Sequence, residues 1–105
     1  MRRGATALAL CALGITTAGC TRRADAVACQ AILDRYVRMG AGDDPGLRAL
    51  PPAQAELVLE ERLRARRATP AYVDAASRCA NEVSADEAAC ALKANSPGDW
   101  EACLE

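Results

Sequence analysis

The sequence has no histidine and no phenylalanine, and only one tryptophan and two tyrosines among its 105 residues. Histidine is the usual general base and the commonest metal ligand near neutral pH, so its absence disfavours acid–base catalysis and metal binding. The chain also lacks a nucleophile motif, a phosphate-binding loop and a metal-ligand constellation. Cofactor pockets are lined mainly by large apolar and aromatic groups, which are scarce here. We therefore expect a protein that is not an enzyme and holds no cofactor.

The N-terminal segment has the three-part layout of an export signal. Residues 1–3 are basic, residues 5–15 are almost wholly apolar, and small residues fill positions 17–19. The apolar run of about 11 residues is shorter than the roughly 20 that a transmembrane helix needs, so we expect its removal. Thr17-Ala18-Gly19-Cys20 resembles a lipobox, in which the cysteine thiol receives diacylglycerol before cleavage. Thr17 stands where a large aliphatic residue is usual, which leaves a plain secretory signal as the alternative.

Cleavage before Cys20 would remove 19 of the 105 residues and leave 86, enough for one small domain. We expect a signal peptide over 1–19, a lipidated tether over 20–24 and a helical domain over 25–105. Because two of the 13 basic residues leave with the signal, 11 face 14 acidic residues, a net charge near −3. Such a balance disfavours nucleic acid as a partner, since phosphate binding needs a basic surface.

A lipid on Cys20 would hold the protein on a membrane, facing the periplasm within the cell envelope. Thr21, in place of an acidic residue directly after Cys20, favours the outer membrane over the inner.

The spacing of apolar residues predicts helix almost throughout, and no segment alternates with the period of a strand. Asp25 is the expected N-cap of the first helix and Gly40 its end, followed by a loop over 40–46. Prolines, Thr69 and a Ser84–Glu87 capping box predict the starts of later helices. We expect helices over about 25–40, 51–67, 69–83, 84–94 and 96–104. The predicted fold is an all-α, disulfide-stapled bundle of four to five short helices.

The six cysteines divide into three groups. Cys11 leaves with the signal and Cys20 carries lipid, so four remain: Cys29, Cys79, Cys90 and Cys103. An even number in an exported domain of this size predicts two disulfides. No pair has the C-x-x-C spacing, which disfavours both a zinc site and a redox-active disulfide.

Geometry favours one of the three pairings of these cysteines. Cys29 and Cys79 lie on the main apolar stripes of their helices, whereas Cys90 and Cys103 flank the turn at 95–97 and would lie level in an antiparallel hairpin. We predict the disulfides Cys29–Cys79 and Cys90–Cys103. The alternative joins Cys79 to Cys90 around Ser84 and leaves Cys29 for Cys103.

The spacing Cys79-(x10)-Cys90-Ala91-Leu92-Lys93-Ala94-(x8)-Cys103, after a cysteine on an N-terminal helix, resembles that of a group of small cysteine-rich helical lipoproteins of Gram-negative bacteria. The resemblance covers about the last third of the chain and the signal. It implies the helical fold and the envelope location. It implies no catalytic residue, because no activity is established for that group.

The remaining polar and aromatic residues have structural interpretations. We expect Trp100, Tyr36 and Tyr72 in a core otherwise filled by alanine, leucine and valine, for which the disulfides are necessary supports. Asp43-Asp44 is interpreted as turn chemistry rather than a calcium or catalytic pair. The run at 60–67 is interpreted as a solvated face with Glu–Arg pairs, with a patch for anionic lipid headgroups as the alternative.

Two classes of function therefore stay open. The favoured class is a non-enzymatic envelope lipoprotein that acts as a structural or protein-binding module, with a protein of the envelope as its partner. The alternative is a small secreted or membrane-anchored enzyme, or an accessory subunit, that uses Asp/Glu chemistry. That alternative requires carboxylates that converge in one cleft with raised pKa values.

Overall fold

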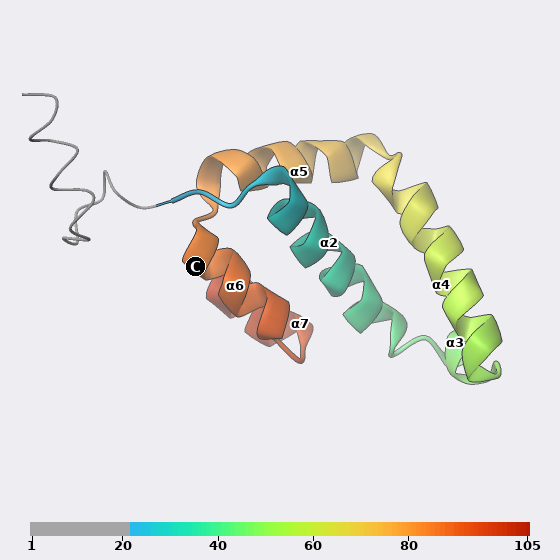
Figure 1. The fold of residues 1–105 in the computed structure, drawn as a ribbon. Helices are drawn as coiled ribbons and strands as arrows, with labels where there is room; N and C mark the ends of the chain where they lie inside the picture. The colour runs from blue at the N-terminus through green and yellow to red at the C-terminus, as the bar shows by residue number, and fades with distance from the viewer. Residues whose placement is uncertain (1–21) are drawn as a thin grey trace, which may run out of the picture.

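A computed structural model describes residues 22–105, and the expected signal peptide over 1–19 and the lipidation site Cys20 lie outside that part of the chain. The described residues form an all-α bundle stapled by two disulfides, as predicted (Figure 1). Its helices are α2 (Ala26–Ala41), α3 (Pro45–Arg48), α4 (Pro52–Arg67), α5 (Pro70–Glu82), α6 (Ala85–Lys93) and α7 (Pro97–Cys103). None of these helices is long and apolar enough to cross a membrane.

Most helices begin where side-chain caps are available. The side chains of Asp25 and Thr69 each accept a hydrogen bond from a main-chain N–H in the first turn of the helix that follows. At the start of α6, Ser84 and Glu87 form a complete capping box. Proline occupies an early position of α3, α4, α5 and α7, where its missing N–H costs no hydrogen bond. The starts of α2, α4, α5, α6 and α7 confirm the predicted helices, whereas α3 was not predicted.

The connection after α2 differs from the expected open loop. The helix continues past Gly40 to Ala41, and the N–H of Gly42 closes it by donating to main-chain carbonyls of the last turn. The Asp44 carboxylate then accepts a hydrogen bond of 2.8 Å from the N–H of Gly46, and this cap starts the single turn of α3. The loop is therefore shorter than the predicted 40–46, because α2 ends at Ala41 and the short helix α3 begins at Pro45.

α2 is the central helix of the bundle and contacts α4, α5, α6 and α7 (Figure 1). α6 and α7 form a hairpin along one side of α2, and α4 lies on its other side. The buried cluster that we call the stapled core consists of Ala24, Cys29, Ile32, Cys79, Ala88 and Ala91. It is rich in alanine, as the composition predicts, and Leu47 of α3 and Leu63 of α4 are buried outside it.

The two disulfides have the predicted connectivity. The Cα atoms of Cys29 and Cys79 are 5.9 Å apart, and those of Cys90 and Cys103 are 5.7 Å apart. The first bond joins α2 to α5, and the second joins α6 to the end of α7. The alternative pairing through Cys79–Cys90 is therefore wrong.

The segment before α2 is fixed to the bundle by main-chain hydrogen bonds. The N–H of Ala24 donates to the carbonyl of Val83 at 2.9 Å, and the N–H of Ala85 donates to the carbonyl of Arg22 at 2.8 Å. Ala24 is also part of the stapled core. Residues 22–24 of the expected tether are thus attached to the α5–α6 junction, so the chain enters the domain there.

Candidate functional site: the groove between α2 and α4

Ion pairs connect α2 and α3 to α4 at both ends of the space between them. Near the end of α4, Arg67 donates to the Asp34 carboxylate at 2.5 Å. Near the turn after α2, Arg62 donates to the Asp44 carboxylate at 2.7 Å. Leu63 is the one fully buried residue of α4. Charged groups, rather than a wide apolar contact, therefore set the position of α4 relative to α2.

Arg38 of α2 supplies a further link to α4. Its guanidinium donates to Glu56 at 3.1 Å and to Glu60 at 2.6 Å. All three side chains are about half exposed to solvent. Exposed pairs of this kind contribute little stability each, so this link is weaker than the disulfides that hold the rest of the bundle.

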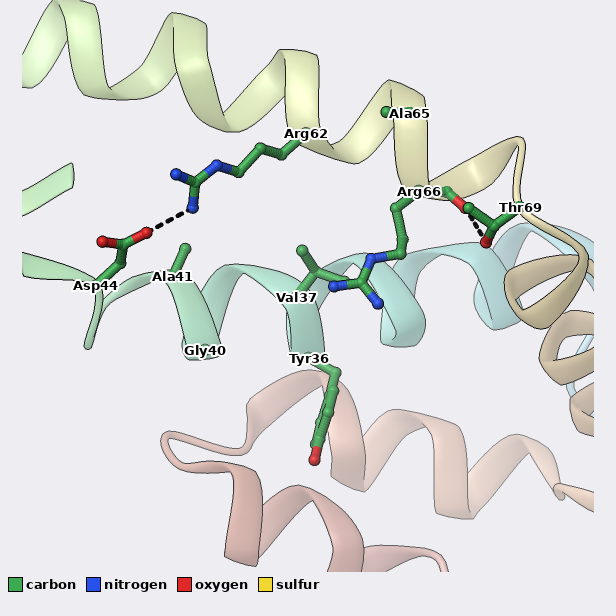
Figure 2. A pocket seen from close by; sticks show the side chains of 9 residues that line it. All are labelled: Tyr36, Val37, Gly40, Ala41, Asp44, Arg62, Ala65, Arg66 and Thr69. Atoms are coloured by element: carbon green, nitrogen blue, oxygen red, sulfur yellow. Dashed lines mark hydrogen bonds and ion pairs between the residues drawn. The ribbon is translucent and has the colours of Figure 1, made fainter. Parts of the chain in front are cut away.

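Between the two helices lies an open groove of about 530 Å³, seen from close by in Figure 2. Gly40 and Ala41 of α2 and Ala65 of α4 line it, and these small groups leave the space unfilled. Val37 adds apolar surface on the α2 side, and Tyr36 lines the groove at its edge with its ring directed away from α4. The groove thus combines apolar walls with charged groups on the α4 side.

Arg66 reaches across this groove, and Figure 2 shows its guanidinium beside Val37. Within residues 22–105 this guanidinium has no ion pair or hydrogen bond. The other arginines of the run are each paired with a carboxylate: Arg62 with Asp44, Arg64 with Glu61 and Arg67 with Asp34. The main-chain carbonyl of Arg66 accepts a hydrogen bond of 2.7 Å from the Thr69 hydroxyl, which fixes the end of α4. The groove therefore presents one cation whose charge is not matched within the described chain.

Asp44 is the carboxylate that lines the groove. The hydrogen bond from Arg62, together with the N–H of Gly46, lowers its pKa below the ordinary value. This carboxylate therefore stays ionised and serves both the cap of α3 and the link to α4. A lowered pKa is the opposite of what a general acid near neutral pH requires.

The position of Tyr36 corrects the expectation that it lies in the core. The residue is 37% exposed, and Figure 2 shows its ring on the side of α2 that faces away from α4. Its hydroxyl donates to Glu101 of α7 at 2.9 Å, and that hydrogen bond raises the pKa of Tyr36. Its ring centroid lies 4.6 Å from that of Trp100. The side chain of Tyr36 therefore joins α2 to α7.

A polar cluster joins three helices at the α5 end of the groove. The Tyr72 hydroxyl donates to the Asp34 carboxylate at 3.0 Å, and Arg67 donates to the same carboxylate. Burial raises the pKa of Tyr72, and the hydrogen bond to Asp34 raises it further. Tyr72 is partly buried, with its hydroxyl at the edge of the bundle, as predicted. The cluster fixes the spacing of α2, α4 and α5.

The structure also shows the positions of the other residues singled out in the sequence. Cys29, Cys79, Cys90 and Cys103 are all bonded in disulfides, which excludes a four-thiolate zinc site in this fold. Asp43 and Asp44 lie in the turn before α3, as predicted. The run at 60–67 contains one internal Glu–Arg pair, Glu61 with Arg64, and its other partners, Arg38, Asp34 and Asp44, come from outside the run. The sequence did not indicate that Arg66, rather than Arg64 or Arg67, would lack a carboxylate partner, because all three are arginines of the same run.

No protein-family model matches the chain, and neither a curated protein nor a solved structure shows a significant similarity to it.

Proposed function

We propose that this chain is a lipid-anchored protein of the cell envelope that catalyses no reaction and binds another protein through the groove between α2 and α4. The observation that carries the proposal is the unpaired Arg66 guanidinium in an unfilled, partly apolar groove. Apolar surface with a few placed polar groups is typical of a binding site. The paired disulfides support an oxidising compartment such as the periplasm.

The place where the chain enters the domain supports an anchor at Cys20. Arg22 and Ala24 bond to the α5–α6 junction, beside the N-terminal half of α2. The groove is built on the C-terminal half of α2, from Tyr36 onward. A lipid on Cys20 would therefore hold the protein by one end of the bundle and leave the groove at the other end open to a partner (Figure 1).

Site-specific photocrosslinking in intact cells tests the proposal. A photoreactive phenylalanine analogue replaces Val37, which lines the groove, or Val27, which is 78% exposed at the other end of the same helix. The expected result is one crosslinked envelope protein from position 37 that is absent from position 27. Crosslinks of equal yield at both positions, or to this chain alone, would contradict the proposal.

A further inference from the structure

We infer that the groove recognises a carboxylate next to an apolar side chain in a segment of the partner protein, with Arg66 as the group that binds the carboxylate. The inference rests on the proposed function and names the chemistry of the partner at that site. Three properties of the groove support the inference: its unpaired positive charge, its apolar walls and its open shape.

The side chain of Arg66 offers several hydrogen-bond donors to a carboxylate. A guanidinium has five N–H groups in a planar fork that matches the two oxygens of a carboxylate. The guanidinium of Arg62 already donates to Asp44 at 2.7 Å, so it is occupied at the opposite end of the groove. Arg66 has no such partner among the described residues and points into the groove (Figure 2). Arg66 is exposed, so water occupies these N–H groups in the free chain, and a carboxylate from outside the chain would replace that water.

The apolar walls of the groove would bind the apolar side chain of the partner segment. Val37 faces the groove from α2, and Ala65 lines it from α4. The volume of about 530 Å³ is enough for one or two large aliphatic side chains beside the bound carboxylate. Burial of such a side chain contributes the affinity that a single exposed ion pair lacks.

The open shape favours a protein segment over a free small molecule, because small-molecule sites enclose most of the surface of their ligand. A membrane surface is disfavoured by the charges around the groove. Anionic lipid headgroups attract clusters of unpaired basic residues. Here the carboxylates of Asp34, Asp44 and Glu60 pair with Arg67, Arg62 and Arg38, so Arg66 is the one unpaired cation among the residues that line the groove.

The test is a selection of displayed random heptapeptides on the purified, oxidised protein. The expected result is enrichment of peptides in which Asp or Glu adjoins a large apolar residue. A selected peptide is then synthesised together with its Asp→Asn or Glu→Gln counterpart, and both affinities are measured by titration calorimetry. The amide peptide should bind about tenfold more weakly or worse, since a charge-assisted hydrogen bond is lost.

Variants of the protein locate the contact. Arg66→Gln should lower the affinity for the acidic peptide about tenfold and abolish its preference over the amide peptide, whereas Arg66→Lys should lose less. Arg64→Gln is the matched control, because it removes the same charge from the same helix at a side chain that is 71% exposed and paired with Glu61. Neither glutamine variant breaks an ion pair or a hydrogen bond to another helix, so both should unfold close to the temperature of the unmodified protein.

Several results would overturn the inference. Selected peptides without an acidic residue would do so, as would equal binding by Arg66→Gln, or Arg66-dependent binding to phosphatidylglycerol vesicles that exceeds binding to any peptide. If position 37 crosslinks a partner in cells while peptide binding ignores Arg66, the inference fails and the proposed function stands. If neither experiment gives a signal, both fail.

Discussion

The indole Nε1 of Trp100 donates a hydrogen bond of 2.9 Å to the main-chain carbonyl of Ile32. Ile32 is completely buried in the stapled core, so this contact fastens α7 to the centre of the bundle. The Tyr36 ring packs beside the indole, with centroids 4.6 Å apart. The single tryptophan thus closes the core, as the sequence predicts, rather than standing exposed as a recognition residue.

Replacement of Trp100 by phenylalanine keeps an aromatic ring at this position and removes the donor. We expect the free energy of unfolding to fall by about 1 kcal/mol, the usual net contribution of such a hydrogen bond. Urea unfolding followed by circular dichroism at 222 nm measures the change. Tyr36→Phe is the control, because it removes an exposed hydrogen bond to Glu101 and should cost less. A larger loss in Tyr36→Phe would contradict this account of α7.

The two disulfides should differ in their accessibility to reductants. Cys90 is exposed, whereas Cys29 and Cys79 are buried in the stapled core. A phosphine or thiol reaches an exposed sulfur first, so graded reduction should open Cys90–Cys103 before Cys29–Cys79. Alkylation at each step followed by peptide mass spectrometry identifies the modified cysteines. Earlier modification of Cys29 and Cys79 would show that the stapled core is less protected than the structure indicates.

The stability of α4 should depend on salt more than that of the rest of the bundle. Three of its four ion pairs to α2 and α3 join exposed or half-exposed side chains, which about 1 M NaCl screens almost completely, whereas the Asp34 side chain of the fourth is 14% exposed. We therefore expect faster amide hydrogen exchange in α4 at high salt, with little change in α6 and α7. Arg38→Gln should reproduce the effect at low salt. Arg64→Gln should not, because its partner Glu61 lies on the same helix. Uniform salt dependence across the chain would contradict the prediction.

The ion pair between Asp44 and Arg62 gives the turn before α3 a defined response to acid. Because folding lowers the pKa of Asp44, the group stabilises the folded chain fully above its ordinary value of 3.8. That stabilisation is lost as the pH falls through the lowered value in the folded protein. An NMR titration of the Asp44 carboxyl carbon should give a midpoint below 3.8. In Arg62→Gln the midpoint should rise, and an unchanged midpoint would show that Arg62 is not the main cause.

The local features of the fold could be predicted because each depends on residues close in the sequence. The caps at Asp25, Thr69 and Ser84 fixed the starts of three helices. The disulfide Cys90–Cys103 followed from the symmetry of a turn, and Cys29–Cys79 followed from two apolar stripes. In each case the residues concerned either recur with the helical period or lie on the two sides of one turn.

The groove could not be predicted, since it depends on the angle between two helices. That angle is set by pairs far apart in the sequence, such as Asp34 with Arg67. Periodicity places such residues on faces but does not say which faces meet. The attachment of Arg22 to the α5–α6 junction was missed for the same reason, because main-chain hydrogen bonds between distant segments leave no pattern in side-chain identity.

The central claim, a protein held on the envelope by lipid at Cys20, is tested most directly by the intact mass and N-terminal peptide of the protein purified from membranes. The account predicts a chain that begins at Cys20 and carries a diacylglyceryl group with an acylated amino terminus. The matched variant Cys20→Ser should give an uncleaved or soluble product without added lipid. A chain that begins elsewhere, or a Cys20→Ser variant that partitions into detergent with the same added mass, would contradict the claim.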